Sequence, residues 1–167
     1  MFVPIPRTEE EVWASFCLTI KQPFTSAVIA GEKKWENQRK PLSRYVENET
    51  WVFLHSSATP WRAKYQSVEE RWTNHPPFRS MKTGMIFGMV RLDNSVHESE
   101  LSAEQIEDPW ITSGDKRNWK WHIGEILIFS TPYEYKRKQG VVESMVKLRT
   151  DIPNLAHELL EKISTSI

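Results

Sequence analysis

Residues 16 to 38 contain the feature that most constrains the fold, which is a strand, a short helix and a second strand separated by proline and glycine. Residues 16 to 20 are rich in β-forming side chains and predict the first strand. Pro23 then stands in the first turn of a short apolar helix, and Gly31 follows as the left-handed residue that ends it. Residues 34 to 38 are expected to form the second strand.

The rest of the chain predicts more strands than helices, joined by irregular connections. Further strands are expected at residues 51 to 55, 84 to 92, 119 to 123, 125 to 129 and 141 to 148. Further helices are expected after Thr8, at 61 to 72, from Ser102 to residue 107, and from 151 to 164. No strand–helix–strand rhythm repeats. We therefore expect an α+β protein, a small pseudo-barrel of mixed or antiparallel strands with helices at its ends.

The length and the cysteine content predict one domain without covalent or metal staples. The chain has 167 residues and no internal repeat or Gly/Ser-rich linker, so residues 1–167 are expected to form a single domain. Cys17 is the only cysteine, which excludes an internal disulfide and a cysteine-based zinc site. The histidines have no metal-ligand spacing, and no phosphate-binding glycine loop or dinucleotide fingerprint occurs. We therefore expect neither a metal nor a cofactor.

The hydropathy pattern predicts an intracellular protein that makes no use of a membrane. The N-terminus lacks the basic region and apolar run of a signal peptide. No window approaches the roughly 18 consecutive apolar residues that indicate a membrane-spanning helix.

The net charge is zero, but the charges are unevenly distributed. Residues 31 to 45 carry five lysines and arginines against two glutamates, and residues 134 to 149 carry the same balance. Between them, residues 93 to 108 carry six acidic side chains and no lysine or arginine. A neutral chain with separate basic segments is better suited to local recognition of a phosphate than to coating DNA, which usually requires a broad positive face.

Gly31, Lys33 and Glu36 form the pattern Gly-x-Lys-x-x-Glu directly after the predicted strand, Gln-Pro pair and helix. This arrangement resembles the signature of the ASCH domain family, a branch of the PUA-like fold, in which the pattern continues to an arginine. Gln38 stands at the arginine position here, and Arg39 follows it. The resemblance covers about residues 16 to 149 and leaves the first 15 residues and the C-terminal helix outside. It implies a PUA-like pseudo-barrel.

The resemblance also implies a small basic cleft that binds RNA, single-stranded nucleic acid or a modified nucleoside. Trp35 and Trp119 lie among charged neighbours and are candidates for stacking on a base. Arg137 lies in a basic turn, where a guanidinium can grip a phosphate with two hydrogen bonds. His55 ends a predicted strand, a place that often lines a ligand mouth in small barrels. The complete set of expected ligand-binding residues is Lys21, Gln22, Pro23, Lys33, Trp35, Glu36, Arg39, His55, Trp119 and Arg137.

Lys33 and Glu36 are also the candidates for catalysis. Burial would lower the pKa of the lysine toward the range of a base or nucleophile, whereas a neighbouring glutamate would keep it charged. Regular strand alternation places positions 33 and 36 on opposite faces, so both reach one pocket only if the turn after Gly31 reorients Lys33 or a bulge separates them.

Some relatives with this pattern are amidohydrolases of N4-acetylcytidine that use a lysine, a threonine and a glutamate. Lys33 matches the lysine, but Glu36 replaces the threonine, and Glu107 or Asp108 would be the nearest third candidate. An amidohydrolase with Lys33 as base or nucleophile is therefore the first alternative, and the sequence leaves open whether the protein is an enzyme. A second alternative is a protein-interaction module, which exposed tryptophans and a docking C-terminal helix would support.

Overall fold

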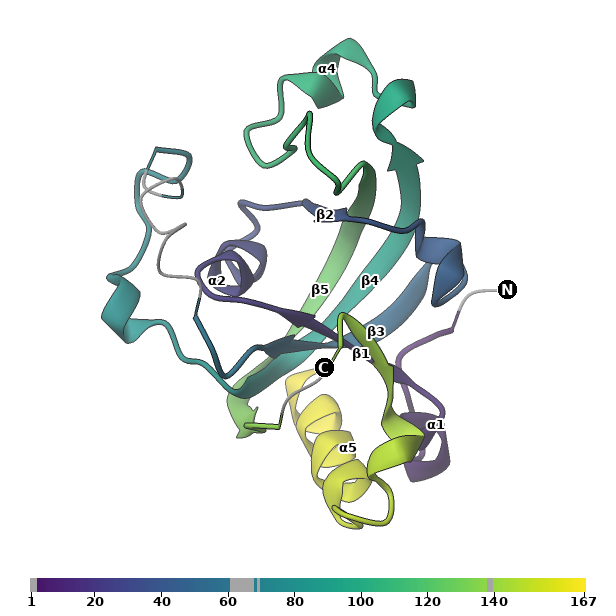
Figure 1. Cartoon of the computed structure of the whole chain (residues 1–167). Helices are drawn as coiled ribbons and strands as arrows, with labels where there is room; N and C mark the ends of the chain where they lie inside the picture. The colour runs from purple at the N-terminus through teal and green to yellow at the C-terminus, as the bar shows by residue number, and fades with distance from the viewer. Residues whose placement is uncertain (1–2, 61–67, 69, 138–139) are drawn as a thin grey trace.

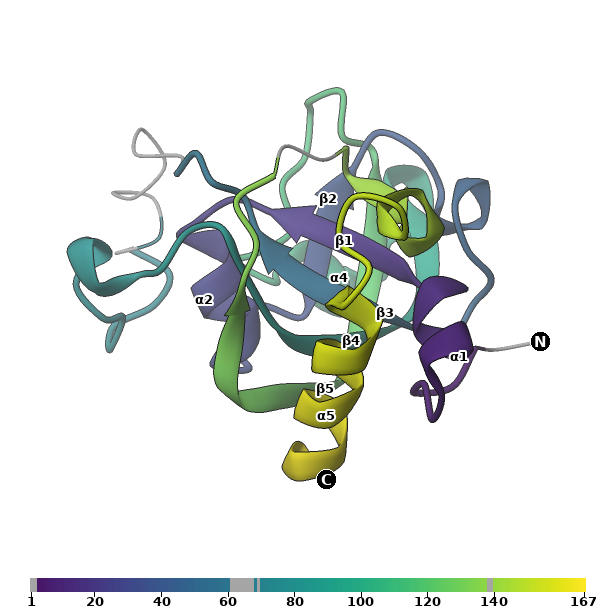
Figure 2. The same ribbon diagram turned by 90° about the horizontal axis from the view of Figure 1, so that it is seen from below.

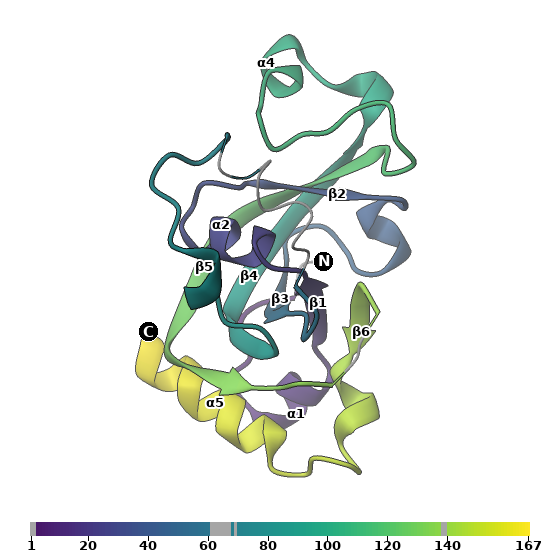
Figure 3. The same ribbon diagram turned by 60° about the vertical axis from the view of Figure 1, so that its left-hand side comes forward.

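The computed structural model describes residues 3–60, 68, 70–137 and 140–167, and within them a single mixed sheet forms the centre of the molecule (Figure 1). Its strands are β1 (Phe16–Ile20), β2 (Trp35–Gln38), β3 (Thr50–Ser56), β4 (Met85–His97), β5 (Trp119–Glu134) and β6 (Val142–Ser144). Their spatial order is β2-β5-β4-β3-β1-β6. Strands β1 and β3 are parallel, and the other neighbours are antiparallel. The sheet curves into a half-barrel (Figure 3), so the expected small α+β barrel of mixed strands is confirmed.

Short helices surround this sheet. They are α1 (Glu9–Trp13), α2 (Phe24–Ile29), α4 (Ala103–Ile106) and α5 (Leu155–Ser166). The predicted caps are present, because Thr8 accepts a hydrogen bond from the backbone N–H of Glu11 and Ser102 forms a reciprocal capping box with Gln105. Within the described residues, 3-10 turns join the other elements at Leu42–Arg44, Phe78–Ser80, Glu98–Glu100 and Met145–Leu148.

Both faces of the central strands are buried, which explains the unbroken apolar run from Trp51 to Leu54 in β3. Phe53 faces a core built with α1 and α5, while Val52 and Leu54 face a second core built with α2. Helix α5 lies across one end of the sheet beside α1 (Figure 2), and Leu159 and Ile163 are buried on its inner face. At the opposite end, β4 and β5 extend beyond the other strands and carry α4 (Figure 1).

Two predicted strand patterns differ from the structure. The segments 119–123 and 125–129 belong to one continuous strand, because Gly124 allows the side chains of Arg91 and Asp93 to lie directly over its Cα. The predicted strand at 141–148 is a strand only from Val142 to Ser144 and then becomes a 3-10 turn. That turn buries both Met145 and Leu148 in one core, whereas strand alternation would separate them onto opposite faces.

Two predicted helices also change in extent. Helix α5 begins at Leu155 instead of 151, because Pro153 disfavours helical backbone angles at the residue before it. Pro23 lies at the N-cap of α2, one position earlier than expected for a first-turn proline. The predicted helix at 61–72 falls mostly outside the described residues.

Candidate functional site

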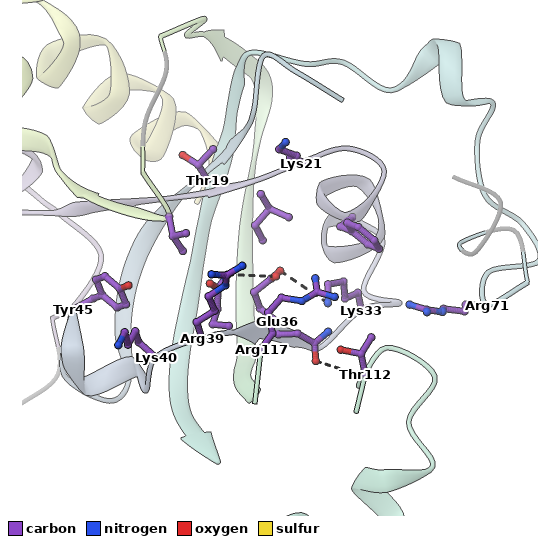
Figure 4. A pocket seen from close by; sticks show the side chains of 15 residues that line it. Thr19, Lys21, Lys33, Glu36, Arg39, Lys40, Tyr45, Arg71, Thr112 and Arg117 are labelled. Atoms are coloured by element: carbon purple, nitrogen blue, oxygen red, sulfur yellow. Dashed lines mark hydrogen bonds and ion pairs between the residues drawn. The ribbon is translucent and has the colours of Figure 1, made fainter. Parts of the chain in front are cut away.

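A cavity of about 450 Å³ lies where the end of β1, the start of α2, strand β2 and the loop before β5 meet. Figure 4 shows side chains from these elements converging on it. Cavities of this size are typical of small-molecule sites. The lining residues are Thr19, Ile20, Lys21, Phe24, Lys33, Glu36, Asn37, Gln38, Arg39, Lys40, Tyr45, Arg71, Thr112, Arg117 and Val141.

The end of α2 directs Lys33 into this cavity. Gly31 has a φ of 77°, in the left-handed region that favours glycine. The chain then folds back, so that the backbone N–H groups of both Glu32 and Lys33 donate to the carbonyl of Ala27. Strand β2 begins only at Trp35, so Lys33 lies in the turn and strand alternation does not apply to it. The turn after Gly31 therefore brings Lys33 and Glu36 to the same cavity.

Lys33 and Glu36 form a buried charged pair on the wall of the cavity. Their side chains are 3% and 12% exposed, and Lys33 Nζ lies 3.9 Å from Glu36 Oε2. The Lys33 ammonium donates to the carbonyl of Trp35 and lies 5.8 Å and 5.9 Å from the ring centroids of Phe24 and Trp110. Glu36 Oε2 accepts no hydrogen bond from any residue that the structure describes. In this pair, the Lys33 ammonium has a hydrogen-bond acceptor, whereas Glu36 Oε2 has no donor among the described residues.

Burial shifts the pKa of both members of the pair. It lowers the pKa of Lys33, because desolvation disfavours the ammonium, and the neighbouring Glu36 carboxylate opposes this shift. It raises the pKa of Glu36 for the same reason, opposed by the positive charges of Lys33 and Arg117. Each shift moves the pKa from its ordinary value toward neutral pH, so both groups gain or lose a proton more readily there than exposed side chains do. Such a pair is a typical functional-site candidate.

The other charged side chains of the described lining are cationic. In addition to Lys33, they are Lys21, Arg39, Lys40, Arg71 and Arg117. Among the described residues that line the cavity, Glu36 is the only one with a carboxylate. Figure 4 shows Arg39 and Arg117 beside Glu36, with Arg71 approaching from a different segment. A partly enclosed cavity with this charge balance attracts anions, because low-dielectric walls focus the field of the cations.

The loop from Trp110 to Asn118 is fastened to the sheet by two buried polar side chains. Asn37 donates to the carbonyl of Trp110 at 2.9 Å and accepts from the N–H of Thr112 at 3.2 Å. Lys120 is fully buried, and its ammonium donates to the carbonyls of Thr112 and Arg117 at 2.5 and 2.7 Å. These bonds hold Thr112 and Arg117 at the cavity.

Comparisons with known proteins identify the fold. No family model matches the chain, and no curated protein matches its sequence. Among solved structures, the chain is similar to a single-substitution variant of an ASCH protein from Zymomonas mobilis, with a TM-score of 0.50. The fold is ASCH-like. The two sequences are 11% identical over 88% of this chain and 95% of that one, so the likeness concerns the fold alone. An ASCH structure from the same organism has a TM-score of 0.47 and 12% identity over 83% and 92% of the two chains.

In this ASCH-like fold, four of the ten expected ligand-binding residues line the cavity. They are Lys21, Lys33, Glu36 and Arg39. Gln22 is buried beside them, and its amide donates to the carbonyl of Lys82 and accepts from Ser26. Pro23 is buried at the start of α2. Gln22 and Pro23 therefore support the cavity wall without lining it.

The other expected ligand-binding residues lie elsewhere. Trp35 is buried with its ring 4.8 Å from that of His122, and Trp119 packs beside His97 at 5.1 Å. His55 is fully buried between Thr19 and the carbonyl of Tyr135, with bonds of 3.0 and 2.6 Å.

The last predicted residues of the site are near the surface. Arg137 is exposed and forms an ion pair with Asp151 at 3.0 Å. Glu107 is exposed at the end of α4, and Asp108 caps the N–H of Trp110 at 2.8 Å. None of these residues lines the cavity.

Sequence reasoning missed Phe24, Tyr45, Arg71, Thr112 and Arg117 as lining residues. The expected aromatic wall is present, but Phe24 and Tyr45 supply it in place of Trp35 and Trp119. A partial signal existed for Thr112 and Arg117, because the polar loop from 112 to 118 is bounded by tryptophans. Arg71 had no signal, since nothing local indicates that its segment approaches α2 and β2.

The described part of the chain has neither a candidate metal site nor a helix that could span a membrane. It contains no group of three or more histidine, cysteine or acidic side chains arranged to hold a metal ion. None of its helices is both long enough and apolar enough to cross a membrane.

Proposed function

We propose that the cavity binds one nucleotide of single-stranded RNA, or a modified nucleoside of similar size. The observation that carries this proposal is the lining, which combines six lysines and arginines with the rings of Phe24 and Tyr45. Cations match the phosphate, and aromatic rings match the faces of a base. The volume of about 450 Å³ suits one such unit and excludes a double helix.

The exposure of the cations supports one orientation of the ligand. Lys21, Arg39 and Lys40 are exposed at the mouth, whereas Lys33 and Glu36 are buried. A phosphate placed against the inner pair would meet the Glu36 carboxylate, and like charges in a buried site repel strongly. The phosphate therefore lies at the mouth and the base lies inside.

The distribution of charge supports binding of one unit in preference to coating of a long polymer. The chain has no net charge, and its acidic segment from residue 93 to 108 would repel a nucleic acid that covered the protruding end of the molecule. Unpaired bases are the usual target of sequence-specific RNA-binding domains, because only they can be splayed out into a pocket.

Binding of a labelled single-stranded RNA to Arg39→Ala and Arg44→Ala variants tests the proposal. Arg39 lines the cavity, whereas the exposed Arg44 lies in the same basic segment but does not line it. We expect Arg39→Ala to weaken binding by about tenfold or more, as loss of a charge-assisted phosphate contact does, and Arg44→Ala to change it little. Equal effects of the two substitutions would show that binding depends on general charge and not on the cavity.

The second candidate function is hydrolysis of an N4-acylated cytidine. The observation that favours it is the buried pair, because burial lowers the pKa of Lys33 and makes a neutral amine more accessible. A neutral Lys33 would take a proton from water as the water attacks the acyl carbon, and would return it to the departing amine. Hydrolysis of N4-acetylcytidine by the wild type and its loss in Lys33→Met, measured by chromatography, would support this activity. No turnover by folded wild-type protein would exclude it for this substrate.

A further inference from the structure

The proposed nucleotide site contains a buried carboxylate oxygen that has no partner among the described residues, and this oxygen indicates what the ligand must present. We propose that the Lys33–Glu36 pair reads the hydrogen-bonding edge of the base and selects bases that carry an N–H donor directly beside an acceptor atom. The inference rests on the proposed function and specifies the class of ligand.

Glu36 supplies the acceptor half of this recognition. Its Oε2 is inaccessible to solvent and accepts no hydrogen bond from the described residues, while Oε1 has a long contact of 3.5 Å with the side-chain amide of Gln38. Leaving a buried carboxylate oxygen unsatisfied is costly, so such atoms in native proteins usually have a role. Of the lining residues that the structure describes, which are rich in cations, only Glu36 supplies a carboxylate to accept an N–H group of the ligand.

Lys33 supplies the donor half. One N–H of its ammonium is used by the carbonyl of Trp35, and an ammonium has three. Lys33 Nζ lies 3.9 Å from Glu36 Oε2, which is too far for a hydrogen bond within the pair. The two groups are therefore side by side on the cavity wall, and a rotation of the Glu36 carboxylate would present Oε2 to the same ligand that Lys33 contacts.

Neighbouring donor and acceptor atoms are a common property of unmodified bases. The N3–H and carbonyl of uracil, the N1–H and carbonyl of guanine, and the amino group and ring nitrogen of cytosine or adenine all provide one. Replacement of these hydrogens by methyl groups removes the donor and adds bulk. Sites built to hydrogen-bond a ligand reject analogues that lack the bonding group far more strongly than apolar pockets reject a methylene.

Titration calorimetry with nucleoside 5′-monophosphates tests the inference. The probes are the monophosphates of uridine, cytidine, adenosine and guanosine, each paired with a counterpart whose Watson–Crick N–H hydrogens are all replaced by methyl groups. For the base that binds most tightly to the wild type, we expect its methylated counterpart to bind about ten- to a hundredfold more weakly.

Variants at Glu36 identify the group responsible. In Glu36→Gln the preference should fall, because a neutral amide is a weaker acceptor, and in Glu36→Leu the two ligands should bind alike. Glu32→Gln is the matched control, since Glu32 is exposed and does not line the cavity, and it should keep the wild-type preference. The nearly isosteric Glu36→Gln keeps the test informative if Glu36→Leu does not fold.

The failures of the two proposals differ. If no monophosphate binds the wild type, the proposed function is wrong and this inference fails with it. Two results would support the nucleotide site but contradict selection of the base by Lys33 and Glu36. Monophosphates could bind equally well with and without methylation, or Glu36→Gln could keep the full preference for the unmethylated base.

Discussion

At the scale of single residues, Lys33 and Glu36 give the cavity a polar wall, and their burial decreases the stability of the fold. Two charges lose their hydration when they are buried, and a separation of 3.9 Å without a mutual hydrogen bond returns only part of that loss. Apolar residues of similar volume would fill the same space without this penalty. The pair is therefore better explained by ligand binding than by folding.

The first prediction concerns the stability of the double variant Lys33→Met, Glu36→Leu. Replacement of a buried ion pair by apolar residues is often neutral or stabilising by about 1–4 kcal/mol, whereas removal of one partner alone leaves an uncompensated charge. We expect the free energy of unfolding, measured in urea, to be at least that of the wild type in the double variant and lower in Lys33→Met. A double variant less stable than both single variants would contradict this account of the pair.

The second prediction concerns pH. Burial raises the pKa of Glu36 above its ordinary value of 4.5. At a pH between the unfolded and the folded pKa, the folded protein therefore keeps a proton on Glu36 that the unfolded chain has released. The stability that this proton provides is fully present below pH 4.5 and is lost as pH rises through the raised folded pKa. We expect the unfolding free energy of the wild type relative to Glu36→Gln to decrease above pH 4.5, with a slope of at most about 1.4 kcal/mol per pH unit.

The exposed Glu32→Gln is the control for this pH series, and its difference from the wild type should not follow the same trend. A difference between wild type and Glu36→Gln that stays constant or grows as pH rises would show that the Glu36 pKa is not raised in the folded protein.

At the scale of secondary-structure elements, the loop between α4 and β5 completes the site because two side chains of the sheet hold it. Asn37 on β2 and Lys120 on β5 are paired directly across the two strands, and both bind backbone groups of this loop. Lys120 is fully buried, yet its ammonium caps two carbonyl groups and does not face the cavity. It is a positioning residue for Thr112 and Arg117.

The third prediction follows from this arrangement. Lys120→Met should weaken nucleotide binding about as much as Arg117→Ala does, and should add little to it in the double variant, because both changes remove the same guanidinium from the cavity. Lys120→Met and Lys21→Ala should be additive, since Lys21 comes from a different element. Lys116→Met is the matched control, because Lys116 lies exposed in the same loop and does not line the cavity.

Calorimetric binding to the four variants and the double variants measures these couplings. Full additivity of Lys120→Met with Arg117→Ala would contradict a role exerted through Arg117. Lys120→Met also leaves two carbonyls without their partner, so a loss of stability of about 1–3 kcal/mol is expected in addition.

The elements that sequence could predict are those fixed by local chemistry. Pro23 and Gly31 bound a helix by their own backbone preferences, and the position of Lys33 after that glycine follows from the same turn. In contrast, Arg71 and Arg117 reach the cavity through contacts between segments far apart in the chain, which no local pattern records. Trp35 and Trp119 illustrate the same limit, since their charged neighbours in sequence say little about what their rings pack against.

At the scale of the whole molecule, the described cations of the other basic segment lie outside the cavity, which that segment lines only with Val141 among its described residues. The cavity draws most of its cations from residues 33 to 40 and from two distant loops. In contrast, Arg137 and Lys147 pair with acidic side chains nearby in sequence, and Arg149 pairs with Glu10 of α1. Helix α5 has its apolar face against the core, so that face is occupied within the molecule. Among the described tryptophans, none is fully exposed. The cavity is therefore a stronger candidate for ligand recognition than helix α5 and the tryptophans are for docking a partner protein.

The fourth prediction concerns salt. A site that holds one nucleotide contacts one or two phosphates, and each contact contributes about −0.7 to the slope of log affinity against log salt concentration for a single strand. We expect a slope between about −0.7 and −1.4 for single-stranded RNA, independent of oligonucleotide length beyond a few residues. A much steeper slope that grows with length would indicate binding along an extended basic surface.

A titration of the isotopically labelled protein with single-stranded RNA, followed by amide NMR signals, tests whether the cavity is the nucleotide site. We expect the signals of residues 33 to 40 and 112 to 117 to shift together as RNA is added, and fully paired RNA of the same sequence to leave them unchanged. Shifts confined to residues 143 to 149, or equal shifts with paired RNA, would contradict the assignment of the cavity as the nucleotide site.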